Sequence, residues 1–385
     1  MSALNGPAAA GRWLSCVTDP GSERQPPARL IGALPGEGIG PEVIDASLGV
    51  LRRLEHAGGR SIEVEIGGPI GITAKRTTGA ALPDETAAFC RDVLARGGAI
   101  LTGPGGGRYV YDLRRELDLF LKLVPVSAGL GLPAASPLRP EVVQAVDLLL
   151  VRENLGGVYQ GRSEQFLDRD GTRILRHSFE TSEPRLRRYL TAAARLAADR
   201  RGHLTVVVKQ GGTPVLSDLW RTWASEAAAD TAIDVSFVDV DLMAYELISR
   251  PQDFDVIAAS NLAGDILSDL TALLIGSRGL SFSGNFSPLG HSVYQTNHGA
   301  AYDIAGRDAA NPIGQILSLS MLLRESLGLH RESRAIEDAV RSVWATGLRT
   351  ADIASSGDRV VGTQEMAEQI AEAAAIQLGA MSRAA

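Results

Sequence analysis

The sequence has few cysteines, no excess of positive charge and no long apolar run. Its two cysteines, Cys16 and Cys90, lie far apart, so they form neither a disulfide framework nor a zinc cluster. The apolar runs stay below the roughly 18–20 residues of a membrane-spanning helix, and residues 1–28 lack the apolar segment of a secretory signal. The net charge of −7 gives no support for nucleic-acid binding. We therefore expect a cytoplasmic protein without membrane or nucleic-acid partners.

Length and patterning predict an α/β protein of about two domains, because short apolar runs alternate with amphipathic ones along 385 residues. Residues 1–28 are rich in Gly, Pro, Ala and Arg and are expected to form a flexible leader. The Gly- and Ser-rich stretch 276–290 is expected to be a loop near a site. Strands are predicted at 29–33, 98–102, 146–151, 204–208 and 254–258, and helices at 43–54, 186–198 and 309–327.

Two glycine-rich segments have an ordinary structural interpretation. Gly36, Gly38 and Gly40 precede Pro41, a spacing that differs from the dinucleotide-binding fingerprint and favours a tight turn before a helix. The glycines of 105–107 also favour a turn, although they would let a ligand approach the backbone closely.

The segment SNLAGDILSD places Asp265 and Asp269 four residues apart, and therefore on one face of a helix. Two like charges so placed repel each other by a few tenths of a kcal/mol unless a cation lies between them. Oxygen-only ligation suits Mg²⁺ or Mn²⁺. Asp241 follows a strand-like run and could complete such a site. A solvated helix face is the alternative.

Several other polar side chains lie where strands or helices end. Arg114 and Arg152 either bind carboxylates through bidentate hydrogen bonds or form surface salt bridges. Lys209 follows the strand-like run LTVVV, so it either emerges into solvent or is a catalytic amine with a lowered pKa. Tyr159 is either a core residue or a proton donor.

In their order along residues 29–352, these segments resemble the β-decarboxylating dehydrogenases, which include the isocitrate, 3-isopropylmalate and tartrate enzymes. The motifs that carry the resemblance are GEGIGPEV, LRRELDLF, VRENLGGVYQG, VDVDLMAYEL, NLAGDILSDL, HGAAYDIAG, ANPIGQILS and GLRTADI. It implies an isopropylmalate dehydrogenase-like two-domain fold. The large cofactor-binding domain would comprise 29–118 and 277–385, and the smaller central domain, 119–276, would carry the interface of a homodimer with a shared active site.

The resemblance also implies roles for individual residues. Asp265 and Asp269 would bind the metal together with Asp241 of the other subunit, and Arg114 and Arg152 would bind the substrate carboxylates. Lys209 of the neighbouring subunit would accept the hydroxyl proton, and Tyr159 would donate a proton after CO₂ leaves. The cofactor contacts would be His298, Gly299, Asp303 and Asn311.

The implied reaction oxidises a malate-type 2-hydroxy acid with transfer of a hydride to NAD, followed by loss of CO₂. The metal ion, Mg²⁺ or Mn²⁺, would stabilise the developing negative charge. Asp303 favours NAD because its carboxylate can accept hydrogen bonds from the ribose hydroxyls and would repel the 2′-phosphate of NADP.

The sequence departs from the family pattern at three places. Val124 replaces a third substrate arginine, and Lys122, on the same strand face, is expected to substitute in part. Val208 and Gly211 flank Lys209 where the family carries other residues. Gln295 stands where a glutamate often precedes the histidine of the cofactor loop.

The segment that sets the substrate's 3-substituent in this family contains Arg108, Tyr109 and Tyr111. These residues favour a polar, aromatic or anionic substituent, and therefore a non-standard 3-substituted malate from a specialised pathway. Two alternatives stay open, namely a catalytically silent, ligand-binding regulatory relative and a 2-hydroxy acid dehydrogenase that does not decarboxylate.

Overall fold

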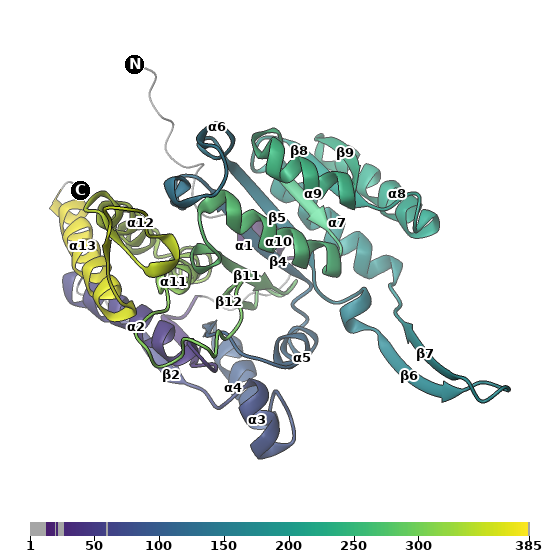
Figure 1. The fold of residues 1–385 in the computed structure, drawn as a ribbon, viewed down its shortest axis with the longest axis horizontal. Helices are drawn as coiled ribbons and strands as arrows, with labels where there is room; N and C mark the ends of the chain where they lie inside the picture. The colour runs from purple at the N-terminus through teal and green to yellow at the C-terminus, as the bar shows by residue number, and fades with distance from the viewer. Residues whose placement is uncertain (1–12, 20, 22–26, 59–60, 384–385) are drawn as a thin grey trace.

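The structure is a computed structural model that describes residues 13–19, 21, 27–58 and 61–383. A mixed sheet runs through the whole molecule, with helices packed on it (Figure 1). Within the described residues, ten strands form this sheet. In spatial order they are β2 (Glu63–Ile66), β1 (Leu30–Leu34), β3 (Ala99–Thr102), β12 (Ser292–Thr296), β11 (Phe282–Phe286), β4 (Leu121–Ser127), β5 (Asp147–Glu153), β10 (Val256–Ala259), β8 (His203–Val208) and β9 (Asp234–Asp239).

Within each end of the sheet, neighbouring strands run parallel to one another. In the middle, β11 runs antiparallel to both β12 and β4, and β4 runs antiparallel to β5. Strands such as β1 and β10 are continuous apolar runs because helices bury both of their faces. The predicted large domain supplies β2, β1, β3, β12 and β11, and the predicted central domain supplies the rest. The two sets meet at the β11–β4 pair, so the sheet is continuous across the expected domain boundary.

Helices cover both ends of the sheet. At one end α2, α11, α12 and α13 pack together, and at the other end α7 packs with α8 and α9 with α10. The helices are α1 (Trp13–Val17), α2 (Gly40–Gly58), α3 (Gly71–Thr78), α4 (Asp84–Ala95), α5 (Tyr109–Glu116), α6 (Pro140–Val143), α7 (Glu183–Ala198), α8 (Pro214–Thr231), α9 (Val240–Ser249), α10 (Asn261–Ile275), α11 (Ile313–Glu325), α12 (His330–Ala345) and α13 (Thr363–Arg383). Short 3-10 turns lie at η1 (Pro133–Ala135), η2 (Val158–Gln160), η3 (Pro251–Asp253), η4 (Arg278–Leu280) and η5 (Ala351–Ile353).

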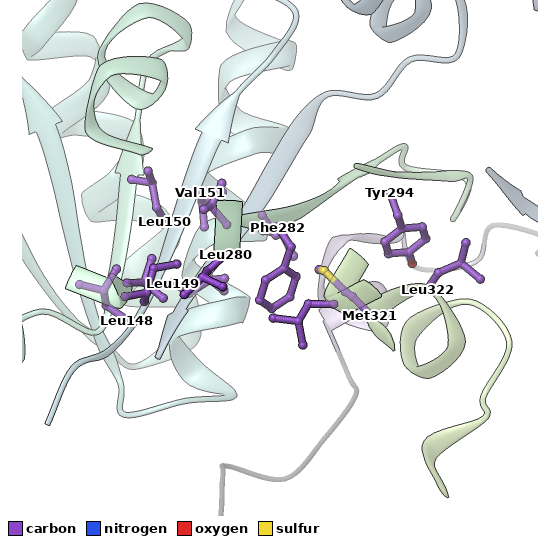
Figure 2. Close-up of a cluster of buried hydrophobic side chains, with 14 of the residues drawn as sticks. Leu148, Leu149, Leu150, Val151, Leu280, Phe282, Tyr294, Met321 and Leu322 are labelled. Carbon is purple, nitrogen blue, oxygen red and sulfur yellow. The ribbon is translucent and has the colours of Figure 1, made fainter. Parts of the chain in front are cut away.

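The main apolar core includes side chains of both β5 and α11. Figure 2 shows the side chains of Leu148 to Val151 on β5, then Leu280 and Phe282, then Tyr294 on β12 with Met321 and Leu322 on α11. All of these side chains are buried. The core therefore joins the strands of the two predicted domains rather than lying within either one.

The predicted strands and helices are confirmed with small shifts of their ends, but the predicted loop at 276–290 is wrong. This stretch contains η4 and the central strand β11. Its small residues serve packing, since a Cβ on Gly284 would lie 2.8 Å from the ring of Phe286 and 3.0 Å from that of Tyr294. Residues that are typical of turns therefore occur here because larger side chains would not fit inside the sheet.

The predicted flexible leader also needs correction for the part that the structure describes. Trp13–Val17 form α1, which packs against α7, and the side chains of Leu14 and Val17 are 2% exposed. Most of the other leader residues lie outside the described part of the chain.

A two-stranded hairpin, β6 (Arg162–Leu167) with β7 (Arg173–Ser178), projects away from the body of the molecule (Figure 1). Most of its residues are exposed along both strands. A second small pair, β13 (Leu348–Arg349) with β14 (Arg359–Val360), lies near the C-terminal helices. Among the described residues, no helix is both long and apolar enough to cross a membrane.

Candidate active site

Asp265 and Asp269 lie one turn apart on α10, as predicted, and their side chains are 39% and 49% exposed. The Asp265 carboxylate accepts hydrogen bonds from Arg152 Nη1 and from the Tyr159 hydroxyl, the latter at 2.9 Å. Asp269 forms an ion pair with Arg278 at 3.1 Å. Cationic side chains therefore relieve the repulsion between the two carboxylates in a single chain.

The two aspartates fit a divalent cation because they offer exposed carboxylate oxygens on one helix face, which is the donor type that Mg²⁺ and Mn²⁺ prefer. Within the described residues of one chain, no group of three His, Cys, Asp or Glu side chains could hold a metal. Asp241 therefore does not form such a group with Asp265 and Asp269 within one chain.

Arg152 is fixed at the end of β5 by Asn261, the first residue of α10. Its Nε and Nη2 donate to Asn261 Oδ1 at 3.0 and 2.8 Å, and the Asn261 amide donates to the carbonyls of Asn154 and Gly156. A Cβ on Gly264 would lie 2.8 Å from Cγ of Arg152, so this glycine admits the arginine beneath the helix. Sequence reasoning missed Asn261, although it opens the NLAGD motif.

Arg114 and Lys122 are buried beside Arg152, with 2% and 3% of their surface exposed. In the strand register, Lys122 lies opposite Arg152 on one side and opposite Asn285 of β11 on the other. Arg114 Nε donates to Asn285 Oδ1 at 3.3 Å, and its buried Nη1 has no hydrogen-bond partner among the described residues. The structure thus gathers three of the predicted substrate residues into one group, which we call the cation cluster: Arg114, Lys122 and Arg152.

Burial and mutual repulsion shift the protonation of the cation cluster. Burial, followed by the charge of Arg152, lowers the pKa of Arg114 to about 9. Burial, Arg114 and Arg152 lower the pKa of Lys122 well below its usual range. Because desolvation and like charge both disfavour these cations, an anionic ligand between them would relieve the cost.

Two tyrosines and Arg108 line the side of the cluster. The rings of Tyr111 and Tyr159 lie 5.3 Å apart, and the guanidinium of Arg108 lies 5.2 Å from the centre of the Tyr111 ring. Arg108 Nη2 also donates to the Tyr159 carbonyl at 3.1 Å. Burial and the hydrogen bond to Asp265 raise the pKa of Tyr159 to about 12, so its hydroxyl keeps its proton at neutral pH.

Tyr109, by contrast, does not shape the substrate side of the cluster as the sequence suggested. It is 3% exposed, it packs in the core around α4 and α5, and its hydroxyl donates to the Gly103 carbonyl at 3.2 Å. Because Tyr109 and Tyr111 are two residues apart on the helix α5, they cannot face the same way.

Lys209 and Asp241 form a separate pair. Lys209 Nζ lies 2.5 Å from Asp241 Oδ1 and 3.6 Å from Asp239 Oδ2. The hydrogen bond to Asp241 raises the pKa of Lys209, so the alternative of a catalytic amine with a lowered pKa is wrong for the single chain. Both side chains of the pair are substantially exposed. Among the described residues, no hydrogen bond or ion pair joins this pair to Asp265 or Asp269, so their predicted meeting across two subunits stays a prediction.

The predicted cofactor residues lie on the irregular segment 297–312. Gly299 and Asp303 are exposed, whereas burial of the His298 ring lowers its pKa. The exposed carboxylate of Asp303 and the open space beside Gly299 suit a bound ribose. Asn311 is 6% exposed, and its amide donates to Asp352 at 3.2 Å while its oxygen accepts the first free amide of α11. These contacts give Asn311 a structural role at the start of that helix.

Comparison with known proteins places these features in a family context. The sequence model of the isocitrate/isopropylmalate dehydrogenases matches residues 30–370. The chain is 39% identical over 356 residues to 3-isopropylmalate dehydrogenase of Geobacillus kaustophilus, covering 88% of this chain and 94% of the relative. It is 40% identical over 361 residues to the Synechococcus sp. enzyme of the same name, covering 90% and 93%. The crystal structure of isocitrate dehydrogenase from Methylococcus capsulatus superimposes with a TM-score of 0.78 at 30% identity, covering 90% of this chain and 99% of that one.

Proposed function

The chain belongs to the isocitrate/isopropylmalate dehydrogenase family, and from this premise we propose that it oxidises and decarboxylates a 3-substituted malate whose substituent is polar or anionic. The family's reaction is the metal-dependent oxidative decarboxylation of hydroxy acids, with NAD and Mg²⁺ or Mn²⁺ as cofactors. What we propose beyond this class is the substrate, the choice of NAD over NADP, and the residues that act.

The cation cluster carries the substrate proposal. Guanidinium groups such as those of Arg114 and Arg152 can bind carboxylates through two hydrogen bonds. Arg114 Nη1 is buried and has no hydrogen-bond partner among the described residues. Lys122 adds a third basic group where Val124 leaves none, and Arg108 and Tyr111 add a polar, aromatic wall. An isopropyl group gains most from an apolar pocket, so this wall favours a different substituent.

Each of the remaining residues has a proposed chemical role. In one chain the hydrogen bond to Asp241 raises the pKa of Lys209, so the amine is protonated there. Lys209 of a second copy would accept the hydroxyl proton only once Asp241 binds the cation instead of the amine. Tyr159, whose hydroxyl stays protonated at neutral pH, would donate a proton to carbon 3 after CO₂ departs. When bound, the divalent cation would supply electrostatic stabilisation of the oxygen that becomes negative. Asp303, with His298, Gly299 and Asn311, would contact the adenosine side of NAD.

The proposal includes a second copy of the chain. In one chain the hairpin β6–β7 is exposed, and so are several apolar side chains on α9 and α10, which another copy could cover. An isolated two-stranded hairpin is marginally stable in water, so β6–β7 is expected to pair with another surface. A hollow of about 360 Å³ on α10 is lined by Ile266, Leu270 and Leu273 next to Asp269. The exposed apolar residues of α9, α10 and the hairpin region are Leu242, Tyr245, Leu262, Ile266, Leu273, Phe166, Leu167, Leu175 and Phe179.

The proposal is tested by offering the purified protein NAD, Mn²⁺ and a panel of 3-substituted malates while NADH and CO₂ are measured together. We expect equal amounts of NADH and CO₂, the highest kcat/KM on a polar or anionic substituent, and loss of turnover with a chelator or with Asp269→Asn. Lys75→Met, an exposed lysine on α3, is the control and should behave as wild type.

Each other outcome has its own meaning. A preference for 3-isopropylmalate, the substrate in the names of the relatives, would contradict the substrate proposal while keeping the reaction. NADH without CO₂ would indicate a dehydrogenase that does not decarboxylate. Tight binding of a malate without any turnover would indicate a silent relative.

A further inference from the structure

Glu37 lies in the tight turn between β1 and α2, and its carboxylate joins two other segments of the chain. Its Oε2 accepts hydrogen bonds from the amides of Ile72 at 2.9 Å and Gly106 at 3.1 Å, and its Oε1 accepts the amide of Thr73. The amides of Ile72 and Thr73 belong to the first turn of α3, where backbone donors lack helical partners. Glu37 is therefore an N-terminal acceptor for α3 and an anchor for the glycine-rich segment 103–107.

The fourth partner of Glu37 comes from the cofactor segment. The hydroxyl of Tyr302 donates to Glu37 Oε2 at 2.8 Å, although 53% of the tyrosine is exposed. Tyr302 directly precedes Asp303, the residue that we expect to contact the ribose of NAD. One carboxylate thus connects the start of α3 and the glycine-rich segment to the neighbour of Asp303.

The protonation states suit this connection. Burial alone would raise the pKa of Glu37, but the hydrogen bonds from Thr73, Gly106 and Ile72 outweigh burial and lower the pKa to about 2. Burial and the bond to Glu37 raise the pKa of Tyr302 to about 12. The acceptor is therefore charged and the donor is protonated across the range in which enzymes work, and charge-assisted bonds of this kind are the stronger ones.

The three segments meet so closely that only glycine fits at the contact points. A Cβ on Gly106 would lie 2.6 Å from the Tyr302 hydroxyl, and one on Gly71 would lie 2.2 Å from Glu37 Oε2. A second hydrogen bond joins the Glu37 turn to the cofactor segment, because the Ile39 amide donates to the Ala300 carbonyl at 2.9 Å. Gly106, which resembled an ordinary turn former in the sequence, is thus required by the convergence around Glu37.

We propose that Glu37 is a positioning residue for the cofactor, acting through the Tyr302 hydroxyl to fix the segment that carries Asp303 before NAD binds. The inference rests on the proposed contact between Asp303 and NAD. A preordered segment loses less conformational entropy on binding, so the hydrogen bond should strengthen cofactor binding without touching the reacting atoms. It should consequently act on KM for NAD and leave kcat nearly unchanged.

The decisive variant is Tyr302→Phe, which removes only the hydroxyl. We expect the Kd for NAD, measured by calorimetry, and the KM for NAD to rise about tenfold, with kcat changed less than twofold. In the protein without cofactor, amide hydrogen exchange in residues 298–306 should become faster. Glu37→Gln should have at least as large an effect, because it places an amide donor opposite the backbone donors of α3.

Controls separate positioning from a loss of stability. Glu55→Gln also removes a carboxylate that accepts a backbone amide, that of Ile62 at 2.6 Å, and it should bind NAD as wild type does. The double variant Glu37→Gln with Tyr302→Phe should bind NAD no more weakly than Glu37→Gln alone, because both changes break one connection.

The outcomes distinguish this inference from the proposed function. If Tyr302→Phe binds NAD like wild type, or loses only thermal stability, the positioning role is wrong while the dehydrogenase proposal stands. If the wild-type protein does not bind NAD at all, the proposed cofactor is wrong and the positioning role is overturned with it.

Discussion

Lys122 lies on a central strand between Arg152 and Asn285 of the neighbouring strands, where a cationic amine is unfavourable without an anion. The chain has three lysines, and two of them, Lys122 and Lys209, are at predicted active-site positions while Lys75 is exposed on α3. The sequence predicted Lys122 from the two-residue spacing to Val124. The sequence could not predict that Arg152 lies directly opposite Lys122, because strand register depends on long-range pairing.

Replacing Lys122 by Met keeps the length and apolar volume of the side chain but removes the amine. We expect the KM of the preferred substrate to rise about 10- to 100-fold, since a hydrogen bond to a charged group contributes about 1.5–3 kcal/mol. The measurement is steady-state kinetics at saturating NAD and Mn²⁺, with Lys75→Met as the control. An unchanged KM would remove Lys122 from the substrate site.

At the scale of elements, α1 shows how a short segment is held by packing rather than by its own propensity. Five residues are too few for a stable isolated helix, yet Leu14 and Val17 are buried in the main core. The Trp13 ring lies 5.2 Å from the guanidinium carbon of Arg324, and the Leu14 amide donates to Glu325 at 3.3 Å. Because α1 also packs on α7, it connects the two predicted domains.

The substitution Leu14→Ala should therefore destabilise the protein, although Leu14 lies far from the candidate active-site residues in the sequence. We expect a loss of about 2–4 kcal/mol in the free energy of unfolding, as for other buried leucines. Urea denaturation followed by circular dichroism measures it, with Leu289→Ala, at a leucine that is 56% exposed, as the matched control. Equal stabilities of the two variants would mean that α1 contributes no packing energy.

At the scale of the whole molecule, the proposed active site is incomplete in one chain. Asp265 lies on α10, whereas Asp241 lies on α9 and Lys209 directly follows β8. Among the described residues, no ion pair connects Asp265 to Lys209 or Asp241. The exposed hairpin and the apolar faces of α9 and α10 are where we propose that a second copy docks. Two symmetric sites would then each combine residues of both chains.

Mixing two inactive variants tests this sharing. Lys209→Met and Asp269→Asn should each be inactive alone, whereas in a mixed dimer one site regains both residues and the other lacks both. Random pairing after co-expression should restore about a quarter of wild-type activity. Mass measurement in solution confirms that mixed dimers form. Mixed dimers that stay inactive would show that each site lies within one chain.

The order of local motifs by itself determined the reaction family and the α/β fold and predicted the candidate site residues, because each motif is contiguous and its residues need only short-range spacing. Tertiary structure alone decided that β11 is a strand, that α1 docks, and that Tyr109 is buried. It alone joined Glu37 to Tyr302, which lie 265 residues apart. Each of these depends on which distant segments meet, and the packing energy of such meetings outweighs local propensity.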